Sequence, residues 1–80
     1  MISGSQIRAA RGFLRWSIKD LAERSGVSWP TIQRLEQDDG IPNTKAQTLL
    51  DVKKALEIAG IEFTGTPDDY PGLRFRTRTY

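Results

Sequence analysis

Residues 17–36 read SIKDLAERSGVSWPTIQRLE, and this stretch decides the fold. Ser17, followed by an acid three residues later, is typical of a helix start. Gly26 is typical of a helix end, because glycine adopts left-handed backbone conformations without penalty. A second helix begins only two residues later, around Ser28, with Pro30 in its first turn. The stretch therefore predicts two short helices joined by a tight turn.

The spacing of small and apolar residues predicts that these two helices cross steeply. Counted from Ile18 as position one, the small or apolar positions are five, nine, ten, fifteen and eighteen, occupied by Ala22, Gly26, Val27, Ile32 and Leu35. The alanine allows the two backbones to approach closely, and the glycine reverses the chain. An ordinary helical hairpin uses similar residues without this spacing, so we favour the steeply crossed pair.

Helical periodicity continues before this stretch. Apolar residues spaced i, i+3 and i+7 predict an amphipathic helix over residues 5–15, capped by Ser3 or Ser5. The apolar residues are Ile7, Ala10 and Leu14, with Phe13 alongside. The other face carries an arginine stripe with the same spacing, formed by Arg8, Arg11 and Arg15.

A fourth helix is predicted after the turn-rich loop of residues 37–42. We expect Asn43 or Thr44 to cap it and Gly60 to close it. Its expected inward residues are Ala46, Leu49, Leu50, Val52, Leu56 and Ala59. Beyond Gly60 the apolar period changes to two, which predicts strands over residues 61–64 and 73–77, with a loop between them.

Composition excludes several classes of protein. The chain has 80 residues, of which 38% are apolar, and a net charge of +2, which fits one small domain. It contains no cysteine and no histidine, which excludes disulfide scaffolds, thiolate or imidazole catalysis and nearly all zinc sites. We therefore expect neither an enzyme nor a bound cofactor or metal. No apolar run reaches the roughly 18 residues of a membrane span, so we expect a cytoplasmic protein without membrane contact.

The segments 20–28 (DLAERSGVS), 31–36 (TIQRLE) and 55–60 (ALEIAG) resemble the XRE-type, phage-repressor-like helix-turn-helix family. The resemblance covers residues 7–60, about two thirds of the chain. It implies a mainly α fold with a repressor-like helix-turn-helix domain of four to five helices, and it implies sequence-specific DNA binding that regulates transcription.

The C-terminal part resembles a group of short bacterial regulators that end soon after a strand-like tail. This second resemblance involves residues 55–63 and 71–76. It divides the chain into a helix-turn-helix domain over residues 1–60 and a tail over residues 61–80. The tail is expected to form a small β-hairpin or β-strand element.

The resemblance implies that the recognition helix, residues 28–37, enters the DNA major groove. The family reads bases from positions that correspond here to Trp29, Pro30 and Arg34. Arg34 is the best candidate, because its guanidinium can donate two hydrogen bonds to guanine, although contact with phosphate or solvent is the alternative. Trp29 and Pro30 depart from the family's polar residues, which suggests apolar contact with a thymine methyl group or, alternatively, packing of Trp29 under the turn or against a partner.

Other contacts are expected around this helix. The remaining candidate DNA-binding residues are Ser28, Thr31, Gln33, Gln37 and Lys45. The start of the preceding helix is expected to face a phosphate, although Ile18 replaces the family's usual glutamine. Asp38 and Asp39 would repel phosphate, so their loop must bend away or binding must be weak.

Two further expectations concern architecture. The family pairs an arginine of the first helix with a glutamate near the end of the third, and Arg11 and Glu36 match these positions. Trp16 is expected to be a core residue rather than a functional one.

The need for a second recognition helix predicts a homodimer on double-stranded DNA. We expect the two strands to pair and to join the second copy's hairpin, with dimer contacts from Ile61, Phe63, Leu73 and Phe75. A tail folded back on its own helices, or a disordered tail, is the alternative. The alternative function is a protein-interaction module, such as an antitoxin or anti-repressor, that binds a second protein and binds DNA only secondarily.

Overall fold

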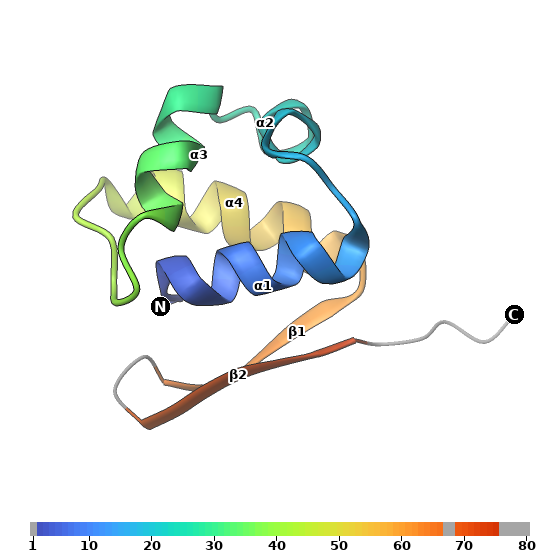
Figure 1. Ribbon diagram of the computed structural model, residues 1–80, viewed down its shortest axis with the longest axis vertical. Coiled ribbons are helices and arrows are strands. Elements are labelled where there is room, and N and C mark those ends of the chain that lie inside the picture. The colour runs from blue at the N-terminus through green and yellow to red at the C-terminus, as the bar shows by residue number, and fades with distance from the viewer. Residues whose placement is uncertain (1, 67–68, 76–80) are drawn as a thin grey trace, which may run out of the picture.

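Residues 2–66 and 69–75 are described by the structure, which is a computed structural model. Within them the chain is mainly helical and ends in a two-stranded antiparallel hairpin. The elements are α1 (Gly4–Leu14), α2 (Ile18–Ser25), α3 (Trp29–Glu36), α4 (Ala46–Ile58), β1 (Ile61–Thr66) and β2 (Asp69–Phe75). Figure 1 shows α1 crossing in front of α4, α2 and α3 above this pair, and the hairpin beneath α1.

The first two helices begin at capping boxes. Ser3 caps α1: its hydroxyl accepts the Gln6 N–H at 3.1 Å, and the Gln6 side chain accepts the Ser3 N–H at 2.9 Å. Ser17 and Asp20 make the same exchange at the start of α2, at 3.0 and 2.9 Å. α2 ends at Gly26, whose φ of +74° lies in the left-handed region, so the predicted turn is confirmed.

The start and the inward face of α4 differ from the prediction. Lys45, and neither Asn43 nor Thr44, is the N-cap residue, and its side chain makes no capping hydrogen bond. Leu50, predicted to point inward, is exposed, because it lies roughly 100° around the helix from the buried Leu49. Ala46 is also exposed, and Ala59 is only partly buried.

One hydrophobic core joins all four helices and the first strand. Its buried members are Ile2, Ile7, Ala10, Leu21, Ile32, Leu35, Leu49, Val52, Ala55, Leu56 and Ile61. Trp16 packs against this core as expected, and the Arg24 guanidinium lies 4.4 Å from the centre of its ring. Because α2 and α3 each contribute fully buried residues, the core fixes their crossing.

The hairpin packs on the chain's own helices, α1 and α4, and its pairing with a second copy stays a prediction. β1 pairs with β2 so that Ile61 lies opposite Phe75 and Phe63 opposite Leu73. Ile61 is only 2% exposed within the chain, so its side chain is covered by the chain's own core, whereas its predicted role as a dimer contact requires an accessible surface. Its strand follows directly after α4, which brings its side chain into the core.

Further contacts hold the hairpin in place. Gln6 of α1 donates a hydrogen bond from Nε2 to the Gly72 carbonyl at 2.8 Å, and the rings of Phe13 and Phe75 lie 4.8 Å apart. The strands extend into residues 65–72, where the sequence predicts a loop, and the pairing is irregular between Thr64 and Thr66. The predicted end of the second strand, residues 76 and 77, lies outside the described residues.

Candidate nucleic-acid interface

The third helix is anchored on one side and exposed on the other. Ile32 and Leu35 are buried in the core against α1 and α2. The exposed side, which we call the outer face of α3, carries Trp29, Pro30, Gln33 and Arg34, and Gln37 follows at the C-cap. Most of the residues predicted to contact DNA therefore lie together on one accessible surface.

The first turn of α3 presents apolar rather than polar groups. Ser28 is the N-cap residue, but its side chain does not cap the helix; its hydroxyl donates instead to the Thr31 hydroxyl at 2.8 Å. Trp29 is 44% exposed and lies outside the hydrophobic core. The alternative in which Trp29 packs under the turn is therefore not supported, and its contact with a base or with a partner stays a prediction.

An ion pair fixes the end of α3 to α1. Arg11 donates from Nε and Nη2 to the two carboxylate oxygens of Glu36, each at 2.8 Å, and from Nη1 to the Trp16 carbonyl at 3.0 Å. The hydrogen bond to Glu36 raises the pKa of Arg11, against the opposing effect of burial. The predicted pair is present, and its forked geometry restricts rotation of α3 relative to α1.

The acidic loop after α3 bends back onto the start of α1. Arg8 donates to the Glu36 carbonyl and, from Nη2, to Asp39 Oδ1 at 3.0 Å. Asp38 turns onto the loop itself and accepts the Gly40 N–H at 3.0 Å. Both carboxylates that were expected to repel phosphate are therefore partnered within the chain.

Gly4 allows this loop to come close to α1. Its N–H donates to the Gly40 carbonyl at 2.9 Å. A Cβ atom at Gly4 would lie 1.9 Å from the Asp38 carbonyl oxygen and 2.2 Å from that of Leu35. The role of this glycine and the Arg8–Asp39 contact were both missed from the sequence, because the contacting residues lie far apart in the chain.

The start of α2 is less suited to phosphate than expected. The Asp20 carboxylate already accepts the Ser17 N–H, and this backbone hydrogen bond, followed by the bond to the Ser17 hydroxyl, lowers the pKa of Asp20. A phosphate at this position would meet a neighbouring negative charge. Lys45 lies exposed at the start of α4, where its charge is accessible.

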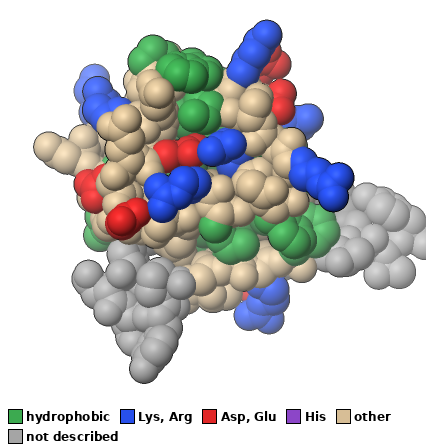
Figure 2. All heavy atoms as spheres, viewed as in Figure 1, with side chains coloured by type: hydrophobic (Ala, Val, Ile, Leu, Met, Phe, Trp, Pro, Cys, Tyr) green, Lys and Arg blue, Asp and Glu red, His purple; other side chains and the backbone are tan. Residues whose placement is uncertain are grey.

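Positive charge is dispersed over this side of the molecule. Figure 2 shows Lys and Arg side chains scattered among acidic ones over α1 and α3, without a continuous basic surface. Arg8 and Arg11 of the predicted arginine stripe contact Glu36 and Asp39, so much of their charge is used within the fold. Any affinity for nucleic acid therefore depends on a few specific side-chain contacts and not on a large positive surface charge.

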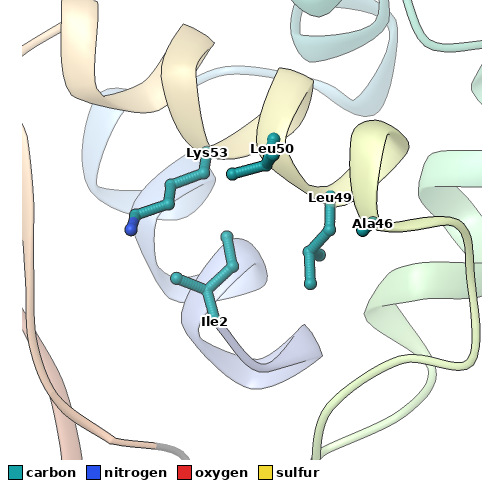
Figure 3. A pocket seen from close by; sticks show the side chains of 5 residues that line it. All are labelled: Ile2, Ala46, Leu49, Leu50 and Lys53. Atoms are coloured by element: carbon teal, nitrogen blue, oxygen red, sulfur yellow. The ribbon is translucent and has the colours of Figure 1, made fainter.

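A second accessible feature is an apolar hollow beside α4. It has a volume of about 320 Å³ and is lined by Ile2, Ala46, Leu49, Leu50 and Lys53. Figure 3 shows Ile2, from the segment before α1, opposite Leu49 and Lys53 of α4. Of the helices in residues 2–66, none combines the length and the apolar character that crossing a bilayer requires.

Comparison with known proteins gives no assignment. No protein-family model and no curated protein matches this chain. The features that bear on function are therefore the outer face of α3, the Arg11–Glu36 pair that holds it, and the acidic loop beside it.

Proposed function

We propose that this protein is a sequence-specific DNA-binding transcriptional regulator that places α3 in the major groove. The observation that carries the proposal is the outer face of α3, which is exposed while the opposite side is fixed in the core. A short helix held rigidly at the end of a tight helical turn is the arrangement that reads base edges in helix-turn-helix proteins. The forked Arg11–Glu36 pair supports the same proposal by fixing the orientation of the helix.

The side chains on this face suggest separate roles in binding. Arg34, exposed in the last turn of α3, is proposed to donate two hydrogen bonds to one guanine. The polar residues around it are proposed to contact phosphates and to fix the register; these are Ser28, Thr31, Gln33, Gln37 and Lys45. Since the net charge is only +2, we expect weak non-specific binding and a shallow dependence of affinity on salt.

We propose that the DNA-bound form is a homodimer whose contacts include the outer part of the hairpin. Phe75 is the most exposed of the predicted dimer residues, and Phe13 beside it is also exposed, whereas Phe63 and Leu73 are partly buried. Sedimentation should show a dimer at tens of micromolar, and Phe75→Glu should shift it to monomer without changing the circular dichroism. A wild-type monomer at that concentration would contradict the dimer.

Selection from random duplex DNA tests the DNA-binding proposal. For a two-fold dimer we expect an enriched motif with symmetric half-sites about one helical turn apart, roughly 34–36 Å. Enrichment of a single asymmetric site would support DNA reading and remove the dimer from the proposal. Failure to enrich any sequence would contradict the proposed function.

A protein-interaction module is the second candidate function, and the apolar hollow beside α4 favours it. Leu50 leaves its side chain exposed at the edge of this hollow. If the hollow binds a protein, a product of a neighbouring gene should co-purify with the wild type and be lost with Leu50→Asp. Ile58→Asp is the matched control, since Ile58 is an exposed aliphatic residue on the same helix outside the hollow.

A further inference from the structure

The N-terminal turn of α3, which we call its tip, carries two apolar side chains on its exposed surface. Trp29 and Pro30 are the first two residues of the helix, and both are exposed. Trp29 keeps 44% of its surface accessible and lies outside the core, so packing within the chain does not explain it. The side chains one turn later, at Gln33 and Arg34, are polar or charged. The outer face of α3 is therefore divided into an apolar tip and a polar remainder.

The chemistry of this tip leaves few ways to contact a base. Proline has no backbone N–H to donate, and the Ser28 hydroxyl already donates to Thr31 at 2.8 Å. The indole of Trp29 has one N–H donor, which is too few for a two-bond contact, and the rest of its surface is carbon. The tip therefore offers mainly apolar contact area.

We infer that Trp29 and Pro30 read the 5-methyl group of a pyrimidine at one position in each half-site. This inference depends on the proposed DNA-binding function. Among the groups that base pairs present in the major groove, the C5-methyl of thymine is the apolar one. 5-Methylcytosine carries the same methyl group at the same ring position, so the apolar tip would accept either base.

The helix also sets the register between this methyl group and the guanine proposed for Arg34. Pro30 and Arg34 are four residues apart, which is roughly 6 Å along a helix at 1.5 Å per residue. Base pairs stack about 3.4 Å apart. We therefore expect the methylated pyrimidine within about two base-pair steps of the guanine, because an inclined helix spans at most its own axial length along the stack.

Single-atom changes in the DNA test this inference. In the duplex enriched by selection, each thymine is replaced in turn by deoxyuridine, which removes only the methyl group, and affinity is measured by fluorescence anisotropy. At one position per half-site we expect the Kd to rise about fourfold, the equivalent of about 0.8 kcal/mol for one buried methyl-sized group. When the same position carries a C·G pair, 5-methylcytosine should bind more tightly than cytosine by a similar factor.

Protein variants show whether the tip is responsible. In Trp29→Ser, and separately in Pro30→Ala, the ratio of the Kd for the deoxyuridine duplex to the Kd for the thymine duplex should fall toward one. Circular dichroism should show that the fold of each variant is intact. Gln33→Ala is the matched control on the same exposed face: loss of its proposed phosphate contact should weaken binding to all duplexes alike, so the fourfold ratio between deoxyuridine and thymine should remain.

The outcomes separate this inference from the function on which it depends. Selective binding that is insensitive to deoxyuridine at every thymine would overturn the methyl contact and leave DNA recognition in place. The methyl contact is likewise overturned if Trp29→Ser alters only self-association or partner binding. If no sequence is bound selectively, both the inference and the proposed function are wrong.

Discussion

The ion pair between Arg11 and Glu36 gives a prediction whose size follows from its geometry. The Glu36 side chain is 7% exposed and that of Arg11 is 21% exposed. Glu36→Ala removes the acceptor of two guanidinium hydrogen bonds, each 2.8 Å long. Breaking one side of a buried pair typically costs about 3–5 kcal/mol. Because Arg11 keeps its bond to the Trp16 carbonyl and some contact with water, we expect about 3 kcal/mol.

Urea unfolding followed by far-ultraviolet circular dichroism measures this loss. The set comprises Arg11→Ala, Glu36→Ala and the double variant, which together form a double-mutant cycle. We expect a coupling free energy of at least about 2 kcal/mol, because the double variant leaves no unpaired charge in the fold. The double variant should therefore be little less stable than either single one.

The hairpin supplies a matched control for this cycle. Arg74 and Glu62 form an ion pair at 3.3 Å, but their side chains are 69% and 39% exposed. Water screens such a pair, so its coupling should lie between about 0 and 1 kcal/mol. If Arg11 and Glu36 show a coupling no larger than this control, the argument that they fix α3 is wrong.

Three other predictions concern α1, α2 and the acidic loop. Gly4→Ala should destabilise the fold by about 1–3 kcal/mol, because the new Cβ would collide with the loop carbonyls. Gly12→Ala in the same helix has open space around its Cβ and should stabilise the fold by up to about 1 kcal/mol. Urea unfolding compares the two variants, and equal changes in the free energy of unfolding would contradict the close approach of the loop to Gly4. The lowered pKa of Asp20 means that its contribution to stability is complete above the unfolded pKa of about 3.9 and disappears as pH falls through the lower folded value. Thermal unfolding across this acid range should thus be less pH-dependent in Asp20→Asn, and an unchanged profile would count against the capping contact. Asp39→Asn removes the carboxylate that Arg8 contacts, which releases the Arg8 charge and raises the net charge by one, so DNA affinity should rise severalfold at low salt and the gain should fade at high salt. Anisotropy titrations that show no gain would contradict a contribution of Arg8 and this loop to DNA binding.

The two short helices α2 and α3 and the tight turn between them could be predicted because each of their signals is local. Ser17, Gly26 and Pro30 act on the few residues around them, so their effects can be read without knowing the rest of the fold. Arg11 and Glu36 could be paired because a family resemblance supplied their positions. The boundaries of α2 and α3 and the buried pair Ile32 and Leu35 therefore agree with the structure.

The packing of distant segments could not be predicted in the same way. Alternation in the last strands shows which side chains share a face, but not which surface covers that face. The contact between Gln6 and Gly72 joins residues 66 positions apart. Likewise, the sequence presents Asp39 as repulsive because no local pattern places it beside Arg8, 31 positions earlier. The prediction that Leu50 points into the core is wrong, because an apolar side chain alone does not show which side of the helix faces the core.

The most direct test of DNA reading by α3 is a double-mutant cycle between Arg34 and the guanine it is proposed to contact. Anisotropy measures binding of wild type, Arg34→Ala and Arg74→Ala to the selected duplex and to duplexes with each base pair changed. Arg74→Ala removes the same charge from the hairpin, on the opposite side of α1 from α3 (Figure 1).

We predict that Arg34→Ala loses about 1–3 kcal/mol on the selected duplex but almost nothing when one particular G·C pair has been replaced. Arg74→Ala should bind all duplexes like the wild type. An equal loss for Arg34→Ala on every duplex, or the same loss for Arg74→Ala, would contradict base reading by α3.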